Sequence, residues 1–338
     1  MQKLGNGEDA MTLSTIIIMP IWRVLARLVV PAFLFSTATY AENTEPPTVH
    51  RFVASQEAWD TNAYWIESAT GIILIDSQML NSDASKLASL IKATGKPVEA
   101  AFITHPHFDH FAGLDTLQQS LGQFPVYSTQ QGVEAAPPFY KQFMAFEFAK
   151  NFEGNLTTHP VFPTKTVSDG ETMTVAGVEL TFHDYGPGEA EGHLLIEVPQ
   201  LSAVFIGDVA MVGHPNWIGE ARLFESKNQL QRLRDDFQAT KTLYSGHGDP
   251  ATPAIASYQL NLITDIEDAV RNARKDTENL GENGGLKRDV ILEITKKLCA
   301  KYDYLNYFNY PPETFMSWNV YGADVALFRQ ARSEQTAS

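Results

Sequence analysis

Hydrophobic residues in the first third of the chain fall in short runs of strand length, separated by turn residues. Asn62–Glu67 and Gly71–Asp76 predict two strands joined by a tight turn. Val98–Ile103 is a continuous apolar run, which is typical of a strand that a sheet buries on both faces. Between them, Ser82–Thr94 has apolar residues at helical spacing and predicts a helix. This part of the chain therefore predicts a sheet with a helix against it.

The middle of the chain repeats this mixture of strands and helices. Further strands are expected at Val178–His183, His193–Val198, Ala203–Ile206 and Lys241–Tyr244, and helices at Phe111–Leu121 and Lys227–Gln238. Because strands alternate with helices and also come as hairpins, the pattern favours a layered α/β sandwich over an all-parallel sheet.

Two regions depart from this rhythm. Val133–Phe152 is rich in aromatic residues, which fits either a lid over an apolar substrate or the packing of an inserted helix into the core. After Pro253 the chain is predominantly helical, with helices expected at Ala254–Leu280 and Lys287–Tyr302. We expect this helical part, residues 255–338, to be an extension that packs on the preceding sandwich.

The amino end has the features of an export signal. Arg23 and Arg27 precede the apolar segment Leu28–Phe35, and small residues lead to Ala41. The two arginines interrupt the apolar stretch, whereas a membrane-spanning helix needs about 20 apolar residues in a row. We therefore expect residues 1–41 to be a signal peptide and the mature protein to be periplasmic or secreted, with no stable membrane association.

The amino-acid composition disfavours or excludes several classes of function. Hydrophobic residues make up 44% of the 338 residues and charged residues 19%, so the chain can bury a substantial core. The net charge of −15 disfavours binding to a nucleic-acid backbone, which requires a basic surface. A small-molecule substrate is the expected partner. Cys299 is the one cysteine, which excludes a disulfide framework and a cysteine-based zinc cluster. Any metal must be held by nitrogen and oxygen ligands.

A dense group of such ligands follows the apolar run Val98–Ile103. His105, His107, Asp109 and His110 lie within six residues. In an extended backbone, residues two positions apart point to the same side, so His105 and His107 can face one point. Asp109 and His110 follow as the chain turns towards a helix and can face a neighbouring point. One loop could thus give two ligands to each of two adjacent metals, and imidazole with carboxylate suits zinc, iron or manganese.

Three downstream positions can complete such a site. His193 begins a predicted strand, Asp208 ends the next one, and His247 lies between Gly246 and Gly248. Each alone is a weak signal, because a histidine at a strand end is usually structural and Gly-Asp is usually a turn. Their order and spacing after the histidine cluster favour a role as ligands.

The set His105, His107, Asp109, His110, His193, Asp208 and His247 resembles the ligand set of the metallo-β-lactamase-fold hydrolases, over about residues 50–250. The resemblance implies an αββα sandwich, here residues 42–254, with two zinc ions at one edge between the sheets. It places His105, His107 and His193 on the first metal. Asp109, His110 and His247 go to the second metal, while Asp208 and a water or hydroxide bridge the two.

Asp208 bears on the kind of reaction. By resemblance, dedicated β-lactamases have cysteine or serine at this position, whereas lactonases and glyoxalase II-like thioesterases have aspartate. We therefore expect a dinuclear zinc hydrolase that attacks an ester, lactone, thioester or amide carbonyl, in which Asp109 orients the nucleophile. The alternatives are a mononuclear iron dioxygenase acting on sulfur compounds and a β-lactamase. His214 and Trp217 follow Asp208 closely and are expected to contact the substrate, and His183 is a candidate support for His193.

Overall fold

The computed structural model describes residues 45–237 and 241–337, which belong to one compact unit that begins at Thr44. The predicted signal peptide, residues 1–41, lies outside the described residues. Among the helices that are described, none combines the length and apolar character needed to cross a bilayer.

Two sheets form the centre of this unit. The first has the order β1-β2-β3-β4-β5-β6. Its strands are β1 (Thr48–Val53), β2 (Asn62–Glu67), β3 (Ile72–Ile75), β4 (Val98–Phe102), β5 (Val126–Ser128) and β6 (Lys165–Thr166). β2 and β3 pair antiparallel with Tyr64 opposite Ile75, so the predicted hairpin is confirmed. From β3 to β6 the pairing is parallel, which brings the carboxyl ends of β3 and β4 to the same edge of the sheet.

The second sheet has the order β11-β10-β9-β8-β7. Its strands are β7 (Thr172–Val175), β8 (Val178–Gly186), β9 (His193–Val198), β10 (Ala203–Gly207) and β11 (Thr242–Ser245). β10 pairs antiparallel with β9 and parallel with β11. The start of β9 and the ends of β10 and β11 therefore lie at the same edge, where the predicted ligands follow.

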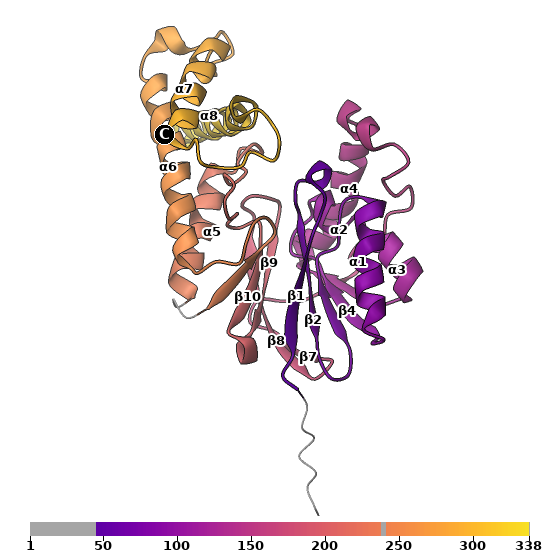
Figure 1. Cartoon of the computed structure of the whole chain (residues 1–338). Helices are drawn as coiled ribbons and strands as arrows, with labels where there is room; N and C mark the ends of the chain where they lie inside the picture. Colours follow the sequence, from indigo (N-terminus) through magenta and orange to yellow (C-terminus); the bar gives the residue numbers. More distant parts are fainter. Residues whose placement is uncertain (1–44, 238–240, 338) are drawn as a thin grey trace, which may run out of the picture. The chain divides into compact units, whose positions relative to one another are not determined.

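Helices cover the outer face of each sheet (Figure 1). Helices α1 (Asn81–Ala93) and α3 (Leu114–Leu121) lie on the first sheet, and α5 (Leu223–Asp236) and α6 (Ala254–Arg274) lie on the second. Between the sheets, a core that includes Tyr64, Phe102 and Phe205 is almost fully buried. The four layers confirm the predicted αββα sandwich.

Some predicted elements have different bounds. The predicted helix Phe111–Leu121 is two helices, α2 (Phe108–Phe111) and α3. They are separated at Gly113, where an added Cβ would lie 2.8 Å from the Gln78 carbonyl oxygen, so the backbone packs too closely there for a side chain. Four short strands, β1, β5, β6 and β7, were not predicted. β6 has only two residues, and β1 and β7 are partly exposed edge strands without a continuous apolar run.

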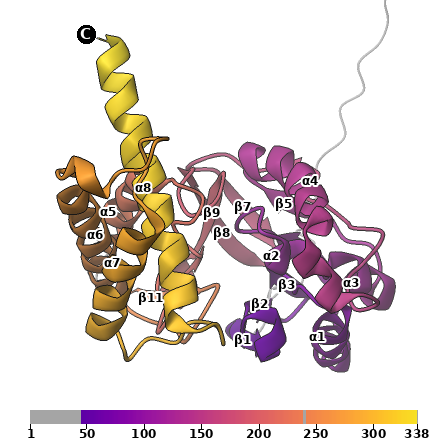
Figure 2. The ribbon, with the colours of Figure 1, turned by 90° about the horizontal axis from the view of Figure 1, so that it is seen from above.

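The carboxyl-terminal part is helical, as predicted. Helices α6, α7 (Arg288–Lys301) and α8 (Pro312–Ala337) share one apolar core with α5 and the second sheet. Figure 2, which views the chain from above, shows α8 and α4 (Gln130–Ala145) on different sides of the same end of the sandwich. After α4 comes the 3-10 helix η2 (Glu147–Phe152), so the aromatic segment Val133–Phe152 is helical throughout most of its length.

A buried ion pair joins two of these helices. Arg274 at the end of α6 donates to the Asp324 carboxylate on α8, and the other Asp324 oxygen accepts from the Leu286 backbone N–H at 2.9 Å. Asp324 is 2% exposed. Removal of one partner leaves the other charge buried and unpaired, which is strongly destabilising.

We expect Asp324→Ala to lower the free energy of unfolding by about 3 kcal/mol, the cost of breaking a buried ion pair. Lys297→Ala is the control, because Lys297 pairs with Glu293 in the open, and it should change stability by less than about 0.5 kcal/mol. Urea unfolding followed by circular dichroism measures both. Equal stabilities for the two variants would show that the buried pair does not hold α8 in place.

Candidate metal centre

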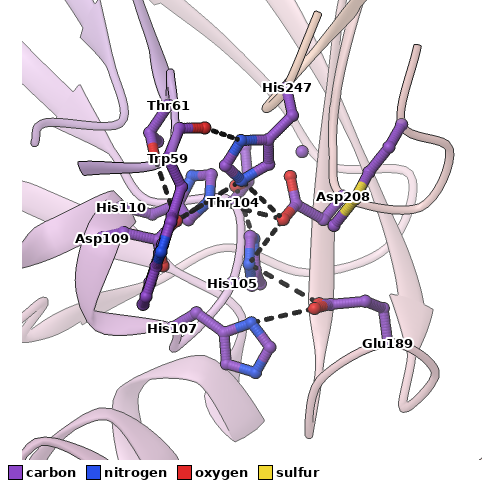
Figure 3. A network of polar contacts seen from close by, with 12 residues as sticks. Trp59, Thr61, Thr104, His105, His107, Asp109, His110, Glu189, Asp208 and His247 are labelled. Carbon is purple, nitrogen blue, oxygen red and sulfur yellow. Dashed lines mark hydrogen bonds and ion pairs between the residues drawn. The ribbon is translucent and has the colours of Figure 1, made fainter. Parts of the chain in front are cut away.

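The seven predicted ligands lie at one edge of the sandwich, and Figure 3 shows six of them, all except His193. His105 and His107 follow β4, and Asp109 and His110 lie on α2 directly after them. His193 begins β9, Asp208 follows β10 and His247 follows β11. All seven side chains are buried, with exposures between 0% and 8%. The sequence order had suggested this meeting, and the geometry brings all seven residues together.

The first group of potential ligands is His105, His107, Glu189 and Asp208, whose ligand atoms lie within 4.8 Å of one another. The Glu189 carboxylate is central to it. One oxygen lies 3.0 Å from Nδ1 of His107, and the other lies 3.6 Å from Nε2 of His105. The same oxygen is 3.4 Å from Nε2 of His193, whose ring stacks on His105 at a centroid distance of 4.8 Å. The Glu189 carboxylate thus lies among three imidazoles, although His193 is not part of the group whose ligand atoms all lie within 4.8 Å of one another.

The second group is Asp109, His110 and His247. Oδ2 of Asp109 lies 3.3 Å from Nε2 of His110 and 3.4 Å from Nε2 of His247. Asp208 lies between the two groups. Its Oδ2 is 3.7 Å from Nε2 of His105, 3.5 Å from Nε2 of His110 and 3.3 Å from Nε2 of His247. One carboxylate therefore faces both groups, as a bridging ligand would.

Unpaired polar atoms show that this region fits cations. Five buried side-chain atoms that face the site have no hydrogen-bond partner: Nε2 of His105, His110 and His193, Oε2 of Glu189 and Oδ1 of Asp208. Leaving a buried polar atom unpaired costs about 1–3 kcal/mol, and native structures rarely do so without a reason. Here all five are lone-pair donors of the kinds that bind zinc, iron or manganese. The clusters are therefore able to bind metal ions.

The opposite ring nitrogen of each histidine is held by the surrounding chain. Nδ1 of His110 contacts Asp76 at 2.9 Å, and Nδ1 of His105 contacts the Thr104 hydroxyl at 3.0 Å. That hydroxyl in turn donates to Asp76 at 2.8 Å. Nδ1 of His247 contacts the Trp59 carbonyl at 3.0 Å. Such contacts fix the orientation of the ring and leave the other nitrogen directed at the metal.

The remaining two histidines have partners from the second half of the chain. Nε2 of His107 lies 3.0 Å from the Glu220 carboxylate, and the Gln229 amide on α5 lies 3.2 Å from Nδ1 of His193. His107 therefore offers Nδ1 to the site, whereas the other four histidines offer Nε2. The partly buried His183, which the sequence suggested as a support for His193, instead contacts Glu197 at 3.1 Å.

The charges in the site agree with its use by cations. Burial would raise the pKa of Asp208, but His247, His110 and His105 hold it well below its ordinary value. For Asp109 too, burial acts to raise the pKa, and His110 and His247 lower it strongly. Burial, helped by His110, lowers the pKa of His105 well below its ordinary value. Burial would lower the pKa of His107, His110 and His247, but neighbouring carboxylates raise it above the ordinary value of histidine. These rings therefore hold protons that metal binding would displace, because ionised carboxylates and neutral imidazole are the forms that bind metal ions.

Close packing around Asp208 requires glycine at position 246. A Cβ there would lie 2.0 Å from Oδ1 of Asp208 and 2.7 Å from Cε1 of His110. Of the two glycines beside His247, Gly246 therefore lets the backbone approach the Asp208 carboxylate and the His110 ring.

A cavity of about 700 Å³ opens onto the site. His107, Asp109, Glu189, Asp208 and His247 line its inner end. Trp217, one of the two residues expected to contact substrate, lines it as well. His214, the other residue expected to contact substrate, does not line the cavity and is only 5% exposed. Its ring stacks on Phe308 at a centroid distance of 4.1 Å, and its Nδ1 contacts the Asn306 carbonyl. Burial lowers the pKa of His214 to about 4, so the ring is neutral.

Sequence reasoning missed three acidic residues at the site: Asp76, Glu189 and Glu220. Glu189 lies four positions ahead of the candidate ligand His193 in a glycine-rich loop, and an acidic residue at this position was a signal. Asp76 ends β3 with a positive φ of 57°, a backbone conformation that the sequence does not reveal. Glu220 lies in a loop whose path the sequence could not predict.

The sandwich and the site together define a class of metal-binding α/β proteins. A sequence model described as the Metallo-beta-lactamase superfamily matches residues 57–247, more than half of the chain. The chain belongs to the metallo-beta-lactamase superfamily, whose members are mostly hydrolytic enzymes.

Solved structures with the same fold are distant in sequence. A beta-lactamase domain protein from Burkholderia ambifaria is 14% identical, with a TM-score of 0.61 over 88% of this chain and 91% of that one. A metallo-beta-lactamase family protein from Thermus thermophilus is 19% identical, with a TM-score of 0.60 over 84% and 93%. A stereoselective inverting sec-alkylsulfatase from Pseudomonas sp. is 17% identical, with a TM-score of 0.56, and the match covers 81% of this chain and 48% of the sulfatase. These likenesses support the fold.

We expect Asp76→Asn to weaken metal binding by about 10–100-fold, because the residue orients His110 and, through Thr104, His105. Asparagine tolerates the left-handed backbone at this position, so the fold should persist. Asp115→Asn is the control, since Asp115 accepts from Thr157 away from the site. Competition with a chromophoric chelator measures the affinities. An unchanged affinity in Asp76→Asn would contradict the orienting role.

Proposed function

We propose that this protein is a dinuclear zinc-dependent hydrolase that cleaves an ester, lactone, thioester or amide. The observation that carries the proposal is the position of Asp208, whose carboxylate lies between two buried groups of ligands at the inner end of a cavity. A second complete group would have no purpose in an enzyme that uses one ion. This favours the hydrolase over a mononuclear iron dioxygenase.

In this proposal His105, His107 and His193 hold the first ion, Asp109, His110 and His247 hold the second, and Asp208 bridges them. Glu189 is a further candidate ligand of the first ion, because its two oxygens lie among the three imidazoles of that group. A pair of divalent cations held there would supply a nucleophilic hydroxide near neutral pH, because metal binding lowers the pKa of water from 15.7 to about 7, and would polarise the carbonyl group.

The chain itself positions the reactants. Thr61 donates to Oδ2 of Asp109 at 3.0 Å and so fixes this carboxylate, which can orient the attacking water as a proton acceptor. In the reaction, the water oxygen forms a bond to the carbonyl carbon and the bond to the leaving oxygen, sulfur or nitrogen breaks. One proton of the water passes to the leaving group. Neither a serine nor a cysteine nucleophile is required, and Cys299 is buried in α7.

Removal of the metal should abolish activity reversibly. After chelation and dialysis the protein should have less than about 1% of its hydrolytic rate, because the nucleophile depends on the ions. Two equivalents of zinc per chain should restore it. If the protein instead takes up oxygen in the presence of a persulfide and binds one iron per chain, it is a dioxygenase and the proposed hydrolase is refuted.

Loss of a single ligand should have a comparable effect. We expect His107→Ala to reduce kcat/KM on the order of a thousandfold and to lower the bound metal below two ions per chain, because it removes one ligand of the first ion. His159→Ala is the matched control, since His159 is exposed and lies outside the site. Elemental analysis and steady-state kinetics measure both quantities. Wild-type turnover in His107→Ala would refute the assignment.

A further inference from the structure

The cavity above the site carries a further conclusion about the substrate, which rests on the proposed function. We propose that the substrate is a neutral ester or lactone with a long alkyl group, and that this alkyl group occupies an aromatic chamber built by the α4–η2 segment and the carboxyl-terminal helical part. We define the aromatic chamber as the part of the cavity beyond the ligand groups.

The chamber is continuous with the reacting end of the site. The same cavity of about 700 Å³ is lined by Asp109, Asp208 and His247 at one end and by aromatic side chains elsewhere. This volume lies in the range of about 300–1,000 Å³ that is typical of small-molecule sites. A substrate whose carbonyl lies at Asp208 must therefore place its remaining atoms in the chamber.

More than half of the residues that line the cavity are Phe, Tyr or Trp. From the α4–η2 side come Phe139, Phe143, Phe146 and Phe148, and Phe143 stacks on Phe108 at a centroid distance of 3.5 Å. The stretch Val133–Phe152 thus contributes both to the cavity and to the core. Four of its five Phe residues line the cavity, whereas Tyr140 is 5% exposed and donates to the Thr157 carbonyl.

The opposite wall comes from the other end of the chain. Phe308 and Tyr310 precede α8, and Phe315, Trp318 and Tyr321 lie on it. These residues lie beyond residue 247, where the match to the superfamily model ends. Figure 2 shows α8 and α4 at the same end of the sandwich, which is where the two walls of the chamber originate. The helical extension thus supplies a part of this cavity that the shared sandwich does not contain.

The lack of cationic residues in the cavity lining limits which substrates can bind in the chamber. Of the residues within 45–237 and 241–337 that line the cavity, none is Lys or Arg. Arg222 is close by in sequence to the lining residue Glu220, but it pairs with Glu191 and Glu220. A carboxylate or sulfate on the substrate would lie in the chamber without a cationic partner, and burial of an unpaired charge is costly. The chamber therefore selects against substrates, such as β-lactams, that would place a carboxylate there.

The mouth of the chamber is apolar too. Phe146, Trp318 and Tyr321 line the cavity and yet are 54%, 39% and 57% exposed. Large apolar side chains exposed together mark a binding surface. A long alkyl chain can therefore remain in contact with aromatic rings from the solvent to the ligand groups.

The test compares three para-nitrophenyl esters with the zinc-loaded full chain: acetate, octanoate and the monoester of suberic acid. The last two have equal length, and only the suberate ends in a carboxylate. Burying a methylene group gives about a fourfold gain, so kcat/KM for octanoate should exceed that for acetate by at least about 100-fold. The suberate monoester should be at least about tenfold slower than octanoate. Equal rates for octanoate and either competitor would overturn the proposal while leaving the hydrolase intact.

A pair of variants tests the role of charge directly. Thr314 lines the cavity at the start of α8 and its side chain is half-buried. Thr314→Lys should raise the suberate-to-octanoate ratio of kcat/KM by at least about tenfold, whereas Thr314→Met, of similar length and uncharged, should not. Tyr304→Ala is a further control and should leave this ratio unchanged. Tyr304 belongs to the same part of the chain, but it is 64% exposed and does not line the cavity. The same ratio in both Thr314 variants would contradict the argument from charge.

A binding measurement separates this proposal from the proposed function. Trp59, Trp217 and Trp318 line the cavity, so 1-decanol, which cannot be hydrolysed, should shift the tryptophan emission, and Phe315→Ala should weaken this binding by at least about threefold. Decanol binding without hydrolysis of any ester, lactone, thioester or amide would refute the hydrolase and retain the apolar site. Ester hydrolysis without decanol binding would refute the apolar site and retain the hydrolase.

Discussion

The Asp208 carboxylate is the group on which the rest of this structure depends. It lies within 3.7 Å of a nitrogen from each of three histidines that belong to two different groups, and one of its oxygens has no partner. A buried carboxylate in this position is stable only next to positive charge. Without cations, protonated imidazoles must supply it. This is why burial and mutual contact move the pKa values of these groups so far from their ordinary values.

The carboxyl-terminal helices support Asp208 through a network of buried amides. Asn216 accepts from the Met211 backbone N–H and donates to the Val209 carbonyl, which fixes the loop that follows Asp208. Gln259 on α6 and Asn319 on α8 each bond to the backbone of Asn216. All three side chains are at most 1% exposed. The helical extension therefore holds the loop behind Asp208 as well as forming one wall of the cavity.

The carboxyl-terminal helices also help to form the cavity. Two parts of the chain that lie far apart in sequence, the α4–η2 segment and α8, face the same cavity. A change in the packing of α8 can thus alter which substrates enter without altering any ligand of the metal centre. In the proposed function, specificity would depend in part on α8, which lies beyond residue 247, where the match to the superfamily model ends.

Much of the sandwich and of the metal centre was predictable because short-range patterns determine them. The Asn62–Asp76 hairpin and the strand before His105 follow from apolar runs, and the seven candidate ligands that meet at the site follow from residue types and order. Glu189 and Asp76 were not predictable, since their roles depend on loop paths and on a left-handed backbone at Asp76. The division of the Phe111–Leu121 helix depends on close packing of Gly113 against Gln78, a contact between distant positions. The walls of the cavity likewise combine segments whose approach no local pattern encodes.

Crystallography of the zinc-soaked protein with anomalous diffraction at the zinc edge tests the central claim most directly. Our account predicts two anomalous peaks at full occupancy, one on each side of the Asp208 carboxylate, with Glu189 beside the first. A single peak, or peaks away from Asp208, would contradict it.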